Sequence, residues 1–159
     1  MLTMQTMRAL CAAALTVGLA AQCPFQTLAT TGYGAGCSPV FPGQTPTLSA
    51  ALDPAACALT VTVGAFGGCC NTFAVGRVLA LGDQPANVPL PQFGAGCTLL
   101  VQPAILLFLP SAAGDTFSLP LAAALPPLTV YAQGAVLYFT TIGFSTDFAL
   151  TAGARFDLS

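Results

Sequence analysis

Aspartates are the residues of this chain whose chemistry comes closest to catalysis. A pair of carboxyl groups can supply the acid and the base of glycoside hydrolysis. Each aspartate, however, sits beside a turn-forming residue, as in Asp53-Pro54 and Gly82-Asp83, and this context is typical of Asx turns and strand-end caps. Asp115-Thr116-Phe117 also lacks the glycine of an aspartic-protease loop. We therefore expect no catalytic aspartate.

Ser145 is the other residue whose surroundings suggest chemistry. Gly143-Phe144-Ser145-Thr146-Asp147 matches a nucleophile elbow in part, but the closing glycine is missing. The chain contains no histidine and no lysine, so a Ser-His-Asp triad, a Cys-His pair and a Ser-Lys dyad are all excluded. We predict a turn entering the last strand, and a protein that is not an enzyme.

The first twenty residues have the features of a secretory signal. Arg8 is the single positive charge near the N-terminus, and the apolar stretch from Leu10 to Leu19 is too short to span a bilayer. Small residues precede a cut after Ala20 or Ala21. We expect residues 1–20 to be a signal peptide and residues 21–159 to form one domain of about 138 residues, secreted or displayed at the cell surface.

The cysteine count fits export. Cys11 would leave with the signal peptide, and an even number of cysteines in an exported chain indicates a disulfide framework. Six cysteines allow fifteen pairings, and adjacent Cys69 and Cys70 are expected to bond different partners. With no CxxC spacing, no histidine and no D-x-D spacing, we expect no zinc or calcium site and no cofactor. The disulfide candidates are Cys23, Cys37, Cys57, Cys69, Cys70 and Cys97.

An aromatic-Gly-Ala-Gly-Cys motif occurs twice, sixty positions apart. Glycines permit a positive φ, so each copy predicts a tight corner that presents an aromatic anchor and a bridge sulfur. Neither copy has the lysine or the following helix of a phosphate-binding loop. A bridge between the two motif cysteines would contribute about 4 kcal/mol on the chain-entropy model. The other corner residues are Tyr33, Gly34, Gly36, Phe93, Gly94 and Gly96.

Charge is nearly absent from this chain. Charged residues make up 5% of the sequence, against about a quarter in typical soluble domains. After the signal, the only basic residues are Arg77 and Arg155, which excludes neutralisation of several phosphates and electrostatic binding to a membrane. A surface without charge self-associates readily because little repulsion separates the molecules. We therefore expect self-association or contact with other envelope proteins, and no nucleic acid partner.

Prolines and apolar runs together predict an all-β fold. Thirteen prolines argue against long helices. Residues 58–63 alternate between Leu or Val and Thr, residues 73–81 and 98–109 are more continuously apolar, and Pro103 is expected to break the latter run. Residues 117–121 alternate, and residues 128–139 predict a strand pair or one strand interrupted at Gln133-Gly134.

The C-terminal segment has the clearest period of two. We expect Phe148, Leu150, Ala152, Ala154, Phe156 and Leu158 on one face, and Thr151, Arg155 and Asp157 on the other. The pattern as a whole favours a single disulfide-linked β-sandwich of seven or eight short strands. A small outer-membrane β-barrel is the less favoured alternative, because six cysteines are unusual there and aromatic girdles are missing.

Four short motifs follow one another along the chain: Tyr33 to Cys37, Leu81-Gly82, Pro89-Leu90-Pro91 before Gly94 to Leu99, and Leu128 to Gln133. In these motifs the chain resembles a family of secreted β-domain proteins of unknown function that is abundant in planctomycete-type bacterial genomes. Cys57, Cys69 and Cys70 depart from that pattern. The resemblance implies an extracellular β-domain and carries no catalytic role.

Two function classes follow from these observations. The first is a structural or self-associating component of the envelope or of an extracellular layer. The second is an extracellular binding module for carbohydrate or for a surface protein, which would need aromatic platforms. The chain has no tryptophan, and the tyrosines available are Tyr33, Tyr131 and Tyr138.

Overall fold

The residues that the structure describes fold into β-strands joined by turns and two short 3-10 helices. The computed structural model describes residues 23–39, 41, 43–66, 71–122 and 125–159. These residues form ten strands, more than the seven or eight expected, because short segments such as Pro85–Pro89 also pair. The strands are β1 (Leu28–Tyr33), β2 (Thr47–Asp53), β3 (Ala58–Gly64), β4 (Thr72–Gly82), β5 (Pro85–Pro89), β6 (Thr98–Val101), β7 (Ile105–Pro110), β8 (Thr116–Pro120), β9 (Leu128–Thr140) and β10 (Ser145–Leu158); the 3-10 helices are η1 (Pro91–Phe93) and η2 (Ser111–Ala113).

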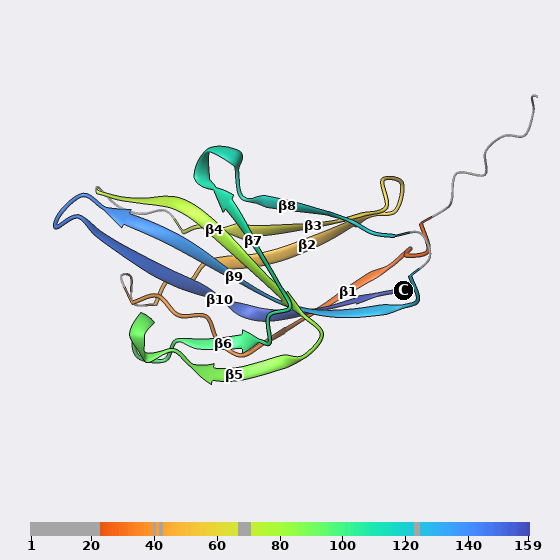
Figure 1. Ribbon diagram of the computed structural model, residues 1–159, viewed down its shortest axis with the longest axis horizontal. Helices are drawn as coiled ribbons and strands as arrows, with labels where there is room; N and C mark the ends of the chain where they lie inside the picture. Colours follow the sequence, from red (N-terminus) through yellow and green to blue (C-terminus); the bar gives the residue numbers. More distant parts are fainter. Residues whose placement is uncertain (1–22, 40, 42, 67–70, 123–124) are drawn as a thin grey trace, which may run out of the picture.

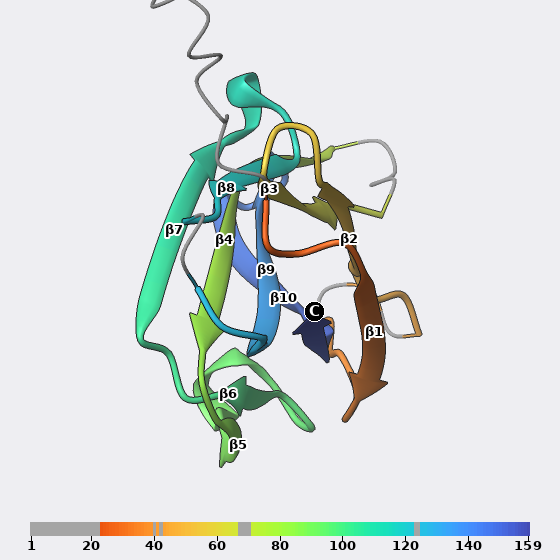
Figure 2. The ribbon, with the colours of Figure 1, turned by 90° about the vertical axis from the view of Figure 1, so that its right-hand side faces the viewer.

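The strands form three antiparallel sheets. Five strands lie in the order β1-β10-β9-β4-β7, three in the order β2-β3-β8, and β5 pairs with β6. Figure 2 shows the large sheet from β7 at one edge to β1 at the other. In Figure 1 the three-stranded sheet lies above β9, β10 and β1 of the large sheet, and the β5–β6 hairpin lies below them. The all-β sandwich predicted from the sequence is confirmed.

The main core lies between the five-stranded and three-stranded sheets. Alternation in β3 buries Leu59, Val61 and Val63, as the sequence predicted, while the threonines between them are more exposed. Each of these side chains stabilises the fold by about 1.5–3 kcal/mol through burial. Their partners from the large sheet and β8 include Leu79, Phe117, Val136, Tyr138 and Phe156.

The runs that the sequence predicted as strands all contain strands, whereas β1, β2 and β5 had no predicted counterpart. The run 98–109 is broken at Gln102-Pro103-Ala104 into β6 and β7, as Pro103 predicted. In contrast, β9 continues through Gln133-Gly134 without interruption. Val63 and Thr151 pack where a Cβ on Gly134 would lie, so the glycine serves close packing and not a break.

The predicted face of β10 is wrong in its central part. The register with β9 shifts between Leu150 and Gly153, which indicates a β-bulge. Beyond the bulge, Ala154, Phe156 and Leu158 lie in the main core as expected. Before it, Ala149 occupies that core and Leu150 faces the opposite side of the sheet. The bulge thus exchanges the two faces of the strand.

Thr151 is also a correction, since we expected it on the face of Arg155 and Asp157, whereas it packs beside Val63 of the main core. Its side chain is fully buried at the bulge. The Thr151 hydroxyl accepts a hydrogen bond from the Gly134 N–H at 2.9 Å and donates one to the Ala152 carbonyl at 2.6 Å. A bulge leaves ladder groups unpaired, and this hydroxyl satisfies two of them.

Two disulfide bonds join distant segments. Cys23 bonds Cys57 and Cys37 bonds Cys97, with Cα–Cα distances of 5.1 and 5.2 Å. Disulfides are typical of proteins that fold in an oxidising compartment. The predicted roles of Cys69 and Cys70, the signal peptide and the cleavage after Ala20 or Ala21 fall outside the described residues.

Arg77 connects the two main sheets near β7. Its Nε donates to the Val63 carbonyl at 2.9 Å, and one terminal nitrogen donates to the Gly114 carbonyl at 3.0 Å. The guanidinium therefore holds the loop after η2 against the end of β3. Within the described ranges, no helix is long and apolar enough to cross a membrane.

Candidate functional site

The two aromatic-Gly-Ala-Gly-Cys motifs lie together at one corner of the molecule, joined by the Cys37–Cys97 bond. Cys37 forms an isolated bridge with Leu150, and its N–H and carbonyl bond that residue's backbone at 2.9 and 2.8 Å. These residues, with Cys97, form a small second core on the outer face of the large sheet, to which Leu90, Phe93 and Ala135 add partly buried contacts. We call this region the motif corner.

Tyr33 anchors the first copy of the motif. Its hydroxyl donates to the Leu100 carbonyl at 2.8 Å, and its ring meets Tyr131 edge-on with centroids 5.9 Å apart. Gly153 lies beneath the ring, where a Cβ would be 2.7 Å from Tyr33 Cε2. Burial is the main cause that raises the pKa of Tyr33, so the hydroxyl remains a donor.

Phe93 anchors the second copy, from η1 at the tip of the β5–β6 hairpin. Its ring contacts Phe148 on β10 edge-on, with centroids 5.3 Å apart. Both aromatic residues therefore act as the anchors that the sequence predicted, but on different parts of the large sheet.

The glycines of the two copies serve different purposes, which refines the prediction of similar corners. Gly34, Gly94 and Gly96 have φ values of +63, +116 and +81° and make the expected turns. Gly36 does not have a positive φ. A Cβ there would lie 3.0 Å from the Ala152 backbone nitrogen, so Gly36 is needed for the close approach of the chain to the β10 bulge.

Gln133 positions this corner, and sequence reasoning missed its role. The side chain is 3% exposed on β9. Its Oε1 accepts from the Leu100 N–H at 2.8 Å, and its Nε2 donates to the carbonyls of Thr98 and Thr151, both at 3.1 Å. One amide thus ties β6 to the β10 bulge. The signal in the sequence was a polar residue within an apolar strand.

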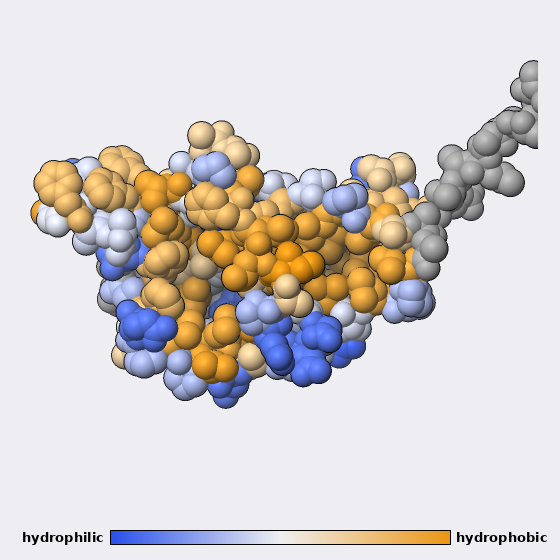
Figure 3. Space-filling view, in the orientation of Figure 1, coloured by the Kyte–Doolittle hydropathy of each residue, from blue (hydrophilic) through white to orange (hydrophobic). Residues whose placement is uncertain are grey.

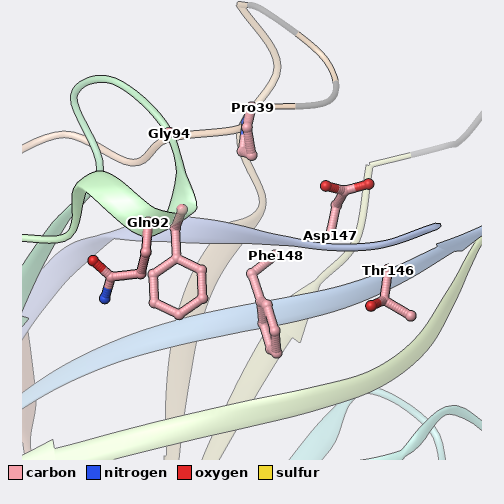
Figure 4. A pocket seen from close by; sticks show the side chains of 7 residues that line it. Pro39, Gln92, Gly94, Thr146, Asp147 and Phe148 are labelled. Carbon is pink, nitrogen blue, oxygen red and sulfur yellow. The ribbon is translucent and has the colours of Figure 1, made fainter.

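A shallow hollow of about 310 Å³ lies beside the motif corner (Figure 4). It is lined by Pro39, Gln92, Phe93, Gly94, Thr146, Asp147 and Phe148. Figure 4 shows Gln92 on one side of Phe148 and Asp147 on the other. A second hollow of about 640 Å³ adjoins it through Pro39 and Gly94 and is lined largely by motif glycines and backbone. These surfaces offer one carboxylate, one amide, two aromatic rings and the hydroxyls of Ser38, Thr45 and Thr146.

An apolar groove of about 350 Å³ opens between the two main sheets on the side of β7 and β8. Its lining includes the buried Leu59 and Leu81, the exposed Ile105 and the half-buried Leu119. Its polar members are Asp83 and Thr129, and the Thr129 hydroxyl donates to Asp157 Oδ1 at 2.6 Å. The groove therefore offers an apolar ligand contact area but little hydrogen bonding.

Asp53 and Asp115 each bond residues close to them in the chain. Asp53 Oδ1 accepts from the N–H groups of Ala55 and Ala56 at 2.9 and 3.1 Å, which is the Asx turn predicted for it. Asp115 accepts from the neighbouring Thr116 hydroxyl at 3.0 Å. Among the residues that the structure describes, no three cysteine or carboxylate side chains gather into a possible metal site.

Asp157 has a lowered pKa because it accepts hydrogen bonds from Thr129 and from Arg155, whose charge adds to the effect. A lowered folded-state pKa stabilises the fold above the ordinary carboxyl pKa of 3.8, and the contribution is lost as pH falls through the lower value. We expect wild-type protein to be more stable than Asp157→Asn at neutral pH and to lose this advantage in acid. Urea unfolding at a series of pH values measures it, with Asp83→Asn as the matched control. If the free energy of unfolding depends on pH in the same way for wild type and Asp157→Asn, Asp157 does not have a lowered pKa.

The fold and this corner define a disulfide-linked β-sandwich whose two glycine motifs are bonded to each other. Comparison with protein-family models, curated proteins and solved structures found no match. The resemblance to the secreted planctomycete-type proteins therefore stays a prediction.

Proposed function

We propose that this protein is a non-catalytic secreted or cell-surface protein that self-associates as a structural component of the envelope or of an extracellular layer. The observation that carries the proposal is the position of its exposed apolar side chains. Of the nine large apolar side chains that are exposed among the described residues, six lie on two surfaces, one at the turn between β9 and β10 and one along β7, while Val75, Val88 and Leu125 lie elsewhere. Figure 3 shows apolar side chains at the end of the molecule where β9 turns into β10 and across the middle.

The first surface, which we call the tip patch, consists of Phe73, Phe139, Ile142 and Phe144. Phe73, Ile142 and Phe144 are 55, 72 and 81% exposed. Phe144 also has a φ of +49°, a conformation that costs a bulky residue roughly 1–2 kcal/mol. Neither burial nor local conformation favours phenylalanine at this position. Contact with another molecule supplies a reason for it.

The distribution of charge supports the same proposal. The tip patch turn, residues 140–145, contains no charged residue, and neither does β7. Arg155 is paired with Asp157 at 2.8 Å, and Arg77 is bonded to backbone carbonyls. Two copies that approach through these surfaces therefore meet little like-charge repulsion. The disulfide bonds and the signal-like N-terminus support an extracytoplasmic site of action.

Sedimentation velocity of the oxidised mature protein over a concentration series tests the proposal. We expect the average mass to rise with concentration. Because apolar contacts carry the association, added salt should not reverse it, whereas charge-driven association weakens with salt. A protein that stays monomeric at high concentration contradicts the proposal.

The hollow at the motif corner supports a second candidate, an extracellular binding module for a carbohydrate. Binding sites combine apolar faces with a few convergent polar groups, and Phe148, Gln92 and Asp147 supply both. The two rings there meet edge-on at 70°, so they do not form one flat platform, and this makes the candidate the weaker of the two. A glycan array probed with the mature protein tests it.

A further inference from the structure

We propose that β7 is the principal contact between copies, pairing antiparallel with β7 of a second copy about a two-fold axis. This inference rests on the proposed function and deepens it by naming the partner strand. The result would join the five-stranded sheets of the two copies into one continuous sheet.

The backbone of β7 is open to such pairing. β7 is an edge of the large sheet and is bonded to β4 alone among the described strands. Alternate residues of an edge strand point their N–H and C=O groups away from the sheet, and this row is a template for another strand. Figure 2 shows β7 at the margin of the sheet with no strand beyond it.

The side chains of β7 lack the features that usually prevent an edge strand from pairing with another molecule. Proteins commonly place charges, prolines or bulges on edge strands to prevent pairing between molecules. β7 reads Ile-Leu-Leu-Phe-Leu-Pro, with a single proline at its end. Ile105, Leu106 and Phe108 are 53, 65 and 61% exposed, although leucine and phenylalanine are usually buried. The strand is therefore apolar and exposed, and the side of it that faces away from β4 is unpaired among the described strands.

Comparison with the other sheet edges shows why a second β7 is the favoured partner. β1, the opposite edge of the large sheet, reads Leu-Ala-Thr-Thr-Gly-Tyr, and β2 ends in Asp53. β8 alternates threonine and serine with its apolar residues. β5 and β6 are the edges of the small sheet; β5 begins and ends in proline, and the backbone of Leu100 on β6 is bonded by Gln133 and Tyr33. Among the described edges, β7 carries the most large apolar side chains that are exposed. Pairing of two β7 strands covers the apolar side chains of both copies and brings no charged residue into the interface.

The geometry of β7 fits a two-fold contact. Leu106 and Phe108 lie opposite Ala80 and Val78 of β4, on the outer face of the sheet. In the pair, these two side chains would meet their counterparts from the second copy. Ile105 also borders the apolar groove, so the second strand would lie beside the mouth of that groove. The interface would thus continue from the edge into existing apolar surface.

Leu106→Lys in the oxidised mature protein is the test, with Thr30→Lys as the matched control on the opposite, exposed edge β1. In a two-fold pair each substitution on β7 occurs twice in one interface, so lysine places two like charges close together. We expect Leu106→Lys to weaken dimer formation by about tenfold or more in sedimentation equilibrium, and Thr30→Lys to leave it unchanged. Phe108→Lys is the second variant and should behave like Leu106→Lys. Far-UV circular dichroism confirms that each variant is folded.

Every other outcome overturns the inference in a recognisable way. If Thr30→Lys weakens association as much as the β7 variants, β7 pairs with β1 in an open chain. If neither β7 variant has an effect while wild-type protein associates, another surface is the interface and only the proposed function survives. If the wild-type protein never associates, both fail.

Discussion

Replacement of both Cys37 and Cys97 by alanine is expected to lower the free energy of unfolding by about 4 kcal/mol. The bond closes a loop of 60 residues, and on the chain-entropy model its removal restores that much freedom to the unfolded chain. The motif corner should loosen first, because the bond joins η1 and the β5–β6 hairpin to the segment after β1. Urea unfolding measures the total loss, and hydrogen exchange of residues 85–101 measures the local one.

A serine pair at the same positions is the control for this prediction. Alanine and serine both remove the covalent link, but they differ in how they pack within the small second core around Leu150. If the alanine and serine variants lose similar amounts of stability, the loss is due to the missing disulfide bond. A loss below about 1 kcal/mol in both would show that the hairpin is held by its other contacts.

Gln133→Met is expected to cost about 3 kcal/mol. Methionine keeps the length of the side chain but removes all three hydrogen bonds, leaving the Leu100 N–H and the carbonyls of Thr98 and Thr151 without this partner. An unpaired buried polar group costs roughly 1–3 kcal/mol. Denaturant unfolding measures the loss.

Gln92→Met, at an exposed position of η1, is the matched substitution and should change stability by less than about 0.5 kcal/mol. Gln133→Glu gives a further check. It retains an acceptor for the Leu100 N–H but places a carboxylate beside two carbonyls, so its deficit relative to wild type should shrink as pH falls and the acid regains a donor. Equal stability of Gln133→Met and wild type would remove Gln133 from its structural role.

The Cys37–Cys97 bond and the Gln133 side chain both stabilise the motif corner. The disulfide bond and the Gln133 amide both hold the β5–β6 hairpin and η1 against the outer face of the large sheet. They therefore determine the hollow beside Phe148, where the carbohydrate alternative would have to act. Leu106 and Phe108 lie on the outer face of the same sheet, but on β7. Variants at these two positions therefore change the association of copies without disturbing the motif corner.

The sequence alone determined the local features of this protein. Alternation in 58–63 placed β3 and its buried face, and Pro103 separated β6 from β7, because a side-chain period and a missing N–H act within a few residues. The paired motifs indicated corners with positive φ, and Asp53-Pro54 indicated an Asx turn, for the same reason. Composition also excluded a histidine-based or lysine-based site before any fold was known.

Only the tertiary structure decided which distant groups meet. The β10 bulge exchanged the faces of Ala149 and Leu150, because register depends on β9 and not on the pattern of β10 itself. Burial of Gln133 and Thr151 and the pairing of Cys37 with Cys97 depend on contacts across many residues of chain. The same holds for β7: its apolar sequence reads equally well as a central strand. Its place at the edge, which carries the proposed interface, arises from the order in which the strands pair.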